Sequence, residues 1–441
     1  MSNVETPAKS AIAEQSEWRS GGRTAVTAAI GYGAGPVLFL TTASVFVAPT
    51  VEATGWSTRE VLISPWLSGL FALCGPLVSR RLNRKGVRST AVLGLLGFSA
   101  LLVLFAVMPL NHLTFYGVAA GIGLFGSFAY AVTFNRAVAN WFSKSAGTAF
   151  GLVGAGGAVM PLVAIPVVSY VIYTYGWRMG YLALGAFALL VSLPNVLFGI
   201  KEPPLAPVRD EAKSRQRGER HAQPSVLRTA RFWVLVLSCT VAIGGANGFL
   251  SNVQPILLDG GLTPVVATSI TTLFTVGVIV GRLGAGALLD LTNKYAVAVS
   301  VLTISGLGAL ALTQVSTLPL LVVGAAALMV AFSQGAEGDI AAYFILDEYG
   351  KKDFATLFAL AMAATAVGGI GVPFAFAWII DSTGSYLGAC ILGTGCYLAS
   401  AALLLVFRAM GRKNGRHDSG AGNDTAGALV TTAPTTPAEN K

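Results

Sequence analysis

Apolar segments of about 20 residues recur along the whole chain. Each is long enough to cross a hydrocarbon core of about 30 Å as a helix, and in lipid a spanning segment must bond its own backbone amides. Of the 441 residues, 54% are hydrophobic and 11% are charged, against roughly 25% charged in ordinary globular proteins. The sequence therefore predicts an all-α membrane protein with twelve transmembrane helices. These begin near residues 24, 60, 89, 112, 146, 178, 232, 264, 295, 318, 354 and 386.

A polar, charged and proline-bearing segment separates the first six predicted helices from the last six. It predicts a division into an N-terminal tail (1–23), a six-helix half (24–200), a central loop (201–231), a second six-helix half (232–407) and a C-terminal tail (408–441). The first 23 residues hold three glutamates and no apolar core. We therefore expect no cleavable signal peptide, and the first helix must itself serve as the membrane signal.

Short matches recur between the two predicted halves at similar offsets. SRRLNR at 79–84 corresponds to GALLDL at 286–291, an offset of 207, and GAVMP at 157–161 matches GIGVP at 369–373, an offset of 212. Two parallel repeats of this kind predict a substrate site near the membrane midplane between the halves, which is moved when one half rocks against the other.

The 29 lysine and arginine residues are unevenly distributed along the chain. Only Arg59 and Arg178 fall in predicted loops on the side opposite the N-terminus, whereas five lie between 80 and 88 and eight between 201 and 231. This positive-inside bias places both termini and the central loop in the cytoplasm. The basic residues are then topology signals that can touch anionic lipid, and the net charge of +9 does not indicate nucleic acid. We expect a multi-pass protein of the cell membrane that functions as a monomer.

No cofactor, metal or enzymatic site is indicated. The four cysteines fall at irregular spacing within predicted helices, which is typical of apolar packing residues. GIGLFG at 121–126 has the letters of a dinucleotide motif, but it lies inside an apolar segment, and no acid follows it until Glu202. These glycines are therefore interpreted as helix-packing residues. No nucleophile, base and orienting group converge, so an enzyme is not expected.

Charged residues deep in the predicted spans are few. Glu337 and Asp339 are the only carboxylates there, no histidine lies deep, and the only bases within spans are Arg136, near a cytoplasmic helix end, and Arg282. Counted from the outer ends of their helices, Arg282, Glu337 and Asp339 lie at matching depth, somewhat inside the midplane. A carboxylate at a helix centre costs about 2.5 to 3.5 kcal/mol on insertion scales. The two acids therefore indicate a functional site, and the alternative is a structural salt bridge or a carboxylate that caps neighbouring helix groups.

Three segments resemble a known family. GWSTREVLIS (55–64), WFSKSAGTAFGLVGAGGAVMPLV (141–163) and YGWRMGYLALG (175–185) are similar to the monocarboxylate transporter group of the major facilitator superfamily, with its oxalate/formate antiporter relatives. The superfamily's loop motif resembles SRRLNRKGVR, with Ser79 in place of its first glycine and Asn83 in place of its aspartate. The second copy, GALLD, keeps Asp290. We assign gating to Asn83, Arg84, Asp290 and Arg136.

The resemblance implies that Arg282, within GVIVGRLGAG, holds a substrate carboxylate. The family's proton-carrying aspartate, four residues earlier, is replaced by Val278, and its helix 1 lysine has no counterpart between Gly31 and Ala48. The acids at 337 and 339 then become candidates for proton coupling. Further substrate-binding candidates are Tyr32, Asn135, Asn247, Asn252, Gln254 and Tyr343.

Residues two apart on a helix point about 200° from one another. We therefore expect only one of Glu337 and Asp339 to face the central cavity. We favour Glu337 as the proton carrier, because Gly335 and Gly338 leave room for water beside it. Asp339, which shares its helix face with Tyr343, is expected to be a structural partner.

The sequence thus predicts a secondary active transporter of a small organic anion, a monocarboxylate, coupled to protons. The first alternative is a proton-driven exporter of amphipathic drugs or cations, against which Arg282 argues. The second is a non-transporting membrane sensor, for which the short tails offer no output domain.

Overall fold

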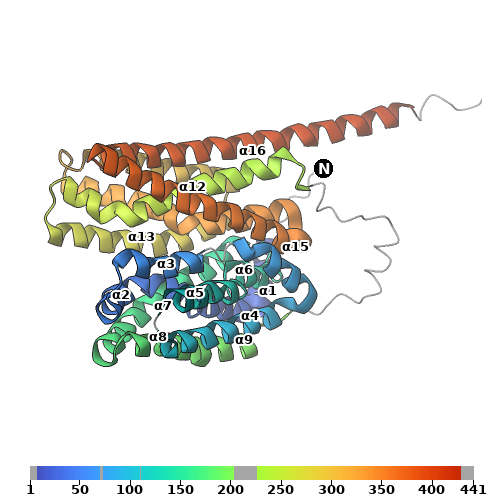
Figure 1. Cartoon of the computed structure of the whole chain (residues 1–441). Helices are drawn as coiled ribbons and strands as arrows, with labels where there is room; N and C mark the ends of the chain where they lie inside the picture. The colour runs from blue at the N-terminus through green and yellow to red at the C-terminus, as the bar shows by residue number, and fades with distance from the viewer. Residues whose placement is uncertain (1–6, 70–72, 110, 203–225, 429–441) are drawn as a thin grey trace, which may run out of the picture.

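The computed structural model describes residues 7–69, 73–109, 111–202 and 226–428, and the described chain is helical without strands. The first set of helices comprises α1 (Pro7–Gly33), α2 (Pro36–Thr54), α3 (Thr58–Gly69), α4 (Gly75–Val107), α5 (His112–Ser127), α6 (Ala131–Ala139), α7 (Ala146–Tyr175), α8 (Trp177–Phe187), the π-helix η2 (Ala188–Ser192) and α9 (Leu193–Gly199). The second set comprises α12 (Ala230–Asp259), α13 (Pro264–Leu291), α14 (Lys294–Ala311), the 3₁₀ turn η3 (Leu312–Gln314), α15 (Leu320–Thr383) and α16 (Leu387–Ala428). Figure 1 shows the two sets as two bundles packed side by side.

Ten helical stretches of the described chain are long and apolar enough to cross a membrane. One of them, α15, has 64 residues and would measure about 96 Å if straight. Its backbone leaves the helical region at Gly350 (φ 77°, ψ 174°), a left-handed φ that favours glycine, so α15 is two spanning helices. Gly86 divides α4 in the same way (φ 78°, ψ 175°). The predicted span near residue 60 falls on α3 and the first part of α4, which flank residues 70–72, outside the described residues.

Two helices extend beyond the predicted spans. Helix α1 begins at Pro7 and not near residue 24, and α16 continues to Ala428 although the apolar segment ends near 407. Hydropathy marks where a helix can lie in lipid, whereas the helical backbone continues wherever local propensity allows, as in the alanine-containing PAKSAIAEQSEW. Most of the other predicted starts agree with the structure within three residues.

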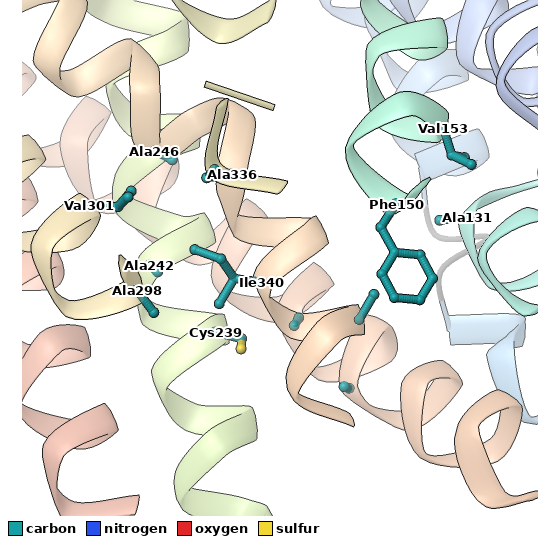
Figure 2. Close-up of a cluster of buried hydrophobic side chains, with 14 of the residues drawn as sticks. Ala131, Phe150, Val153, Cys239, Ala242, Ala246, Ala298, Val301, Ala336 and Ile340 are labelled. Atoms are coloured by element: carbon teal, nitrogen blue, oxygen red, sulfur yellow. The ribbon is translucent and has the colours of Figure 1, made fainter. Parts of the chain in front are cut away.

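Each set has its own packing contacts. In the second set, α12 packs on α15 and α16, and α13 packs on α15. Figure 2 shows small buried residues, among them Ala242, Ala246 and Ala336, where α12, α14 and α15 meet, with Phe150 on the facing helix α7. Small side chains let helix backbones approach closely, which is the main source of helix association in lipid. The two sets contact each other through α13 and α7, and through α15 with α4, α6 and α7.

The two ends of the bundle differ in these contacts. We call the end that carries Lys201, Arg231, Asp290 and Gly350 the linker side, and the end that carries Glu60 and His112 the far side. On the linker side, Phe150 of α7 stacks on Phe354 of α15 with ring centroids 5.8 Å apart. The two sets are therefore in direct contact at the linker side.

Candidate functional site

A cavity of about 480 Å³ lies between the two sets. The first set lines it with residues from α1, α2, α4, α5, α6 and α7, and the second set with residues from α12, α13 and α15. Its polar lining residues include Tyr32, Tyr130, Asn135, Asn247, Arg282, Gln334, Glu337, Asp339 and Thr365. A cavity with this position can change its access when the two sets move relative to each other.

The structure brings six of the nine predicted binding and coupling residues to this cavity. They are Tyr32, Asn135, Asn247, Arg282, Glu337 and Asp339. Asn252, Gln254 and Tyr343 do not line it. The Asn252 side-chain N–H instead donates to the carbonyl of Gly248 (2.8 Å), and Gln254 donates to the Thr268 hydroxyl (3.3 Å).

The guanidinium of Arg282 lies at the contact between α13 and α7. A Cβ atom at Gly154 of α7 would clash with Arg282 Nη1 and would lie 3.0 Å from Asp339 Oδ2. Only glycine therefore allows both charged groups to come against this turn of α7. Arg282 Nε is buried without a hydrogen-bond partner. Among the described residues, no carboxylate oxygen lies within 4.0 Å of an Arg282 nitrogen.

The two carboxylates are buried on different sides of α15. Glu337 is 6% exposed and Asp339 is 3% exposed. Glu337 Oε1 accepts a hydrogen bond from the Ser333 hydroxyl one turn earlier (2.8 Å). Asp339 Oδ2 is buried with no hydrogen-bond partner. The structural role expected for Asp339 stays a prediction.

Both carboxylates line the cavity, contrary to the expectation that only one would face it. The physical reason is Gly338, the residue between them, which also lines the cavity. A Cβ atom at Gly338 would meet nothing within 4 Å. The open space there continues around the face of α15, so side chains that point in different directions both reach it.

Gln334 is a cavity residue that the sequence reasoning missed. The carbonyl of Gly369 can only accept, so the Asn247 side-chain N–H donates to it (3.4 Å). Asn247 Oδ1 is then the acceptor for the Gln334 Nε2–H (3.3 Å), which leaves Gln334 Oε1 buried without a partner. Its spacing of three residues before Glu337 was the signal available, because i and i+3 share a helix face.

Unpaired polar atoms gather at this cavity. Asn135 Oδ1, Arg282 Nε, Gln334 Oε1 and Asp339 Oδ2 are all buried without hydrogen-bond partners. Buried polar groups are normally satisfied, and an unmade hydrogen bond there costs about 1 to 3 kcal/mol. The concentration of unsatisfied atoms in one cavity indicates a binding site for a polar molecule. Tyr130, also missed from the sequence, adds a ring 5.4 Å from that of Tyr32.

Hydrogen bonds join the two sets at the linker side. Asp290 at the end of α13 accepts from the N–H groups of Gly147 and Thr148 and from the Thr148 hydroxyl, each at 2.7 Å. A carboxylate at a helix N-terminus is stabilised by the helix dipole and the free N–H groups there. Asp290 therefore clamps α13 to the start of α7 in the other set.

The other predicted gating residues behave differently. The Arg136 guanidinium donates to the carbonyl of Lys351 in the second set. Asn83 donates to the Thr356 hydroxyl (3.4 Å), a neutral and long contact. Arg84 is exposed and lines a separate groove on α4.

Comparison with known proteins identifies the family to which this chain belongs. The model of the Major Facilitator Superfamily matches residues 24–259, more than half of the chain. The uncharacterized MFS-type transporter YcxA of Bacillus subtilis is 30% identical over 226 residues, which span 50% of this chain and 53% of that protein. Monocarboxylate transporter 12 of Rattus norvegicus is 24% identical over 401 residues, 82% of this chain and 81% of that protein.

Solved structures show the same fold. The E. coli fucose:proton symporter FucP superposes with a TM-score of 0.67 at 14% identity, over 87% of this chain and 98% of that chain. The human organic anion transporter MFSD10 gives a TM-score of 0.67 at 15% identity, over 87% and 99%. The predicted likeness to the monocarboxylate transporter group is confirmed by the named relatives. This multi-pass membrane protein therefore belongs to the major facilitator superfamily, a family of transporters and not of enzymes.

Proposed function

We propose that this protein is a secondary transporter that moves a small organic anion, a monocarboxylate, by alternating access and couples that movement to protons. The observation that carries the proposal is Arg282, a half-buried cation in the cavity between the two sets, whose Nε is buried without a hydrogen-bond partner. A guanidinium binds a carboxylate through two parallel hydrogen bonds. With no protein carboxylate within 4.0 Å of it among the described residues, Arg282 is free to bind one from a substrate.

The named relatives support the substrate class. Monocarboxylate transporters 12 of rat and mouse align over about four fifths of this chain. Their names describe those proteins. We propose the same substrate class for this chain because it belongs to the same family and has Arg282 in its cavity. The Gln334 and Asn135 oxygens add acceptors for a hydroxyl or amide hydrogen on the transported molecule.

Charge balance in the cavity supports proton coupling. Arg282 carries one positive charge, and Glu337 and Asp339 carry two negative charges when both are ionised. A substrate carboxylate would add a third negative charge to a buried site, and unpaired buried charge costs several kcal/mol. Protonation of one acid returns the net charge of the cavity to its value before the substrate bound. We assign the proton to Glu337, because its described hydrogen-bond partner is a neutral hydroxyl, whereas Asp339 lies beside the same turn of α7 as Arg282.

An exporter of amphipathic drugs or cations is the second candidate. The two acids favour it, and the cavity also offers Phe358 and Met362 as apolar contacts. A cation would have to bind in the same cavity as the positive guanidinium of Arg282, which disfavours this alternative. The two candidates differ in the sign of the substrate charge.

We also propose that the linker side faces the cytoplasm and that the protein lies in the cell membrane and functions as a monomer. Support for the orientation comes from the basic residues, which are concentrated at the linker side and between 201 and 231. Reporter fusions at His112 and Asp259 are expected to read as external.

The deciding experiment is transport into proteoliposomes with an imposed pH gradient. A panel of radiolabelled monocarboxylates is compared with lipophilic cations of similar size. Accumulation of a carboxylate that collapses with a protonophore supports the proposal. Gradient-driven movement of cations without any carboxylate transport would establish the exporter instead.

A further inference from the structure

A second depression lies outside the cavity, at the linker-side end of the first set. We call it the basic groove, and it has a volume of about 540 Å³. It is lined by Leu77, Arg80, Arg81, Arg84, Lys85, Leu93 and Phe128. None of these residues lines the cavity between the sets, so the groove is a separate site.

Five of the lining residues form one stripe along α4. Positions 77, 80, 81, 84 and 85 have the spacing i, i+3, i+4, i+7 and i+8, which places them on one helix face. Val78 and Leu82, which lie to one side of this stripe, are 1% and 6% exposed and pack in the core. The basic stripe therefore points away from the protein core and onto the surface of the bundle, where Arg80, Arg84 and Lys85 are exposed.

The four cations of this groove have no acidic partner among the described residues. Glu202 lies against Gly86 at the end of the stripe, but its carboxylate accepts from the Arg88 N–H (3.1 Å). Arg81 Nε is buried and has no hydrogen-bond partner. Neighbouring positive charges repel one another, and an unsatisfied buried donor carries a cost, so a bound anion would relieve both.

The groove is amphipathic along the membrane normal. The charges from Arg80 to Lys85 lie at the linker-side end of α4, and Leu77 precedes Lys85 by about 12 Å of helix. Leu77 is 50% exposed. Leu93 of α4, beyond the break at Gly86, and Phe128 at the end of α5 supply further apolar lining. A site with cations at the membrane surface and apolar contacts one to two turns deeper matches a phospholipid, with its phosphate above its acyl chains.

We propose that the basic groove binds the headgroup and upper acyl chains of one anionic phospholipid. The cations pair with the phosphate and its anionic headgroup, and the apolar residues contact the chains. Basic pockets between transmembrane helices recognise anionic lipid in this way. The proposal does not depend on which molecule the cavity transports.

Native mass spectrometry of the detergent-solubilised full chain tests this proposal. We expect phosphatidylglycerol to bind in a saturable manner, with one lipid held at least tenfold more tightly than phosphatidylcholine. Replacing Arg80, Arg81 and Arg84 with glutamine should weaken that lipid about a hundredfold, because each basic side chain near anionic lipid contributes about fivefold. A matched control replaces the exposed Arg19, Arg228 and Lys352 with glutamine, which removes the same charge outside the groove; it should change binding less than twofold.

Two further measurements separate the groove from a diffuse charge effect. Leu93→Trp keeps all four cations but fills the groove, and we expect it to weaken phosphatidylglycerol binding about tenfold while size-exclusion chromatography shows an intact monodisperse protein. Inorganic phosphate at the same concentration should not displace the lipid. Equal loss in the control variant, unchanged binding in Leu93→Trp, or displacement by phosphate would each overturn the proposal.

Discussion

The two helix sets contribute different chemistry to the same cavity. The second set supplies all of its charged groups, Arg282, Glu337 and Asp339, whereas the first set supplies neutral polar side chains such as Tyr32 and Asn135. The linker-side contacts show the same difference. Asp290 of the second set makes three hydrogen bonds of 2.7 Å to α7, and its counterpart Asn83 makes one contact of 3.4 Å to Thr356.

In a symmetrical pair of repeats, both sets would supply charged and neutral lining. Here the second set supplies the charged groups and the first set supplies the neutral polar groups. The second set holds the three charged groups of the cavity on α13 and α15. The first set supplies a close surface, including Gly154, against which Arg282 and Asp339 lie. We infer that the second set binds the charges of the substrate and the proton. The first set supplies uncharged cavity lining, and the second set moves relative to it.

The largest expected effect is at Arg282. Arg282→Ala should reduce transport of the anion by roughly 150-fold or more, because a lost buried charged hydrogen bond costs about 3 kcal/mol. Arg282→Lys should also fail severely, since an ammonium group lacks the planar two-point contact. Uptake in proteoliposomes at matched protein amounts measures both variants. Asn135→Ala in the first set is the matched control and should lose less than tenfold; an equal loss would remove the contrast between the sets.

The next effect separates the two acids of α15. Glu337→Gln should abolish proton-driven accumulation but keep substrate exchange without a pH gradient, because exchange requires no net deprotonation. Asp339→Asn should affect both activities together, since Asp339 lies beside Arg282 at Gly154. Counterflow and pH-driven uptake are compared in the same proteoliposomes. Accumulation against a gradient by Glu337→Gln would transfer the carrier role to Asp339.

A smaller effect is expected at the linker-side contacts. Asp290→Asn should weaken closure by about 1 kcal/mol, since it removes a charge from the N-terminus of α7, and this shifts the open population roughly fivefold. Asn83→Asp should strengthen closure. Double electron–electron resonance between spin labels that replace Arg84 and Lys352, in a cysteine-free background, measures the distance across the linker side. Opposite shifts in the two variants are expected, and shifts of the same sign would contradict the assigned roles.

The smallest effect lies on the far side of the first set. Hydrogen bonds from the Ser57 N–H (2.7 Å) and hydroxyl (2.8 Å) lower the pKa of Glu60 from its ordinary value of 4.5. A lowered folded-state pKa stabilises the fold above the unfolded value, and this contribution is lost as the pH falls through the folded value. Acid denaturation of Ser57→Ala should therefore show a slightly smaller loss of stability below pH 4.5, measured by thermal melting. A larger loss of stability at low pH in Ser57→Ala than in the unchanged protein would contradict this prediction.

The membrane spans could be predicted from the sequence because the bilayer acts on each segment separately. Length and hydropathy decide whether a helix crosses, so the starts near 112, 146 and 264 coincide with α5, α7 and α13. The common depth of Arg282 and the two acids followed from the same logic, since each residue adds about 1.5 Å along a helix. The loop motif drew attention to Asp290 as a gating residue, a role that stays a prediction, and Asp290 accepts hydrogen bonds from the start of α7.

The site itself was decided by packing between helices, which no local rule contains. Asn252 and Gln254 are as polar as Asn247, yet they do not line the cavity. Gln334 lines it, and its side-chain N–H donates to Asn247. Helical geometry alone predicted that one acid would face away, but the open space at Gly338 admits both. The sequence by itself determined which segments are long and apolar enough to enter the membrane, because that depends on transfer from water to lipid. Only the tertiary structure decided which charges stay unpaired, because that depends on which neighbours the packed helices bring within hydrogen-bond distance.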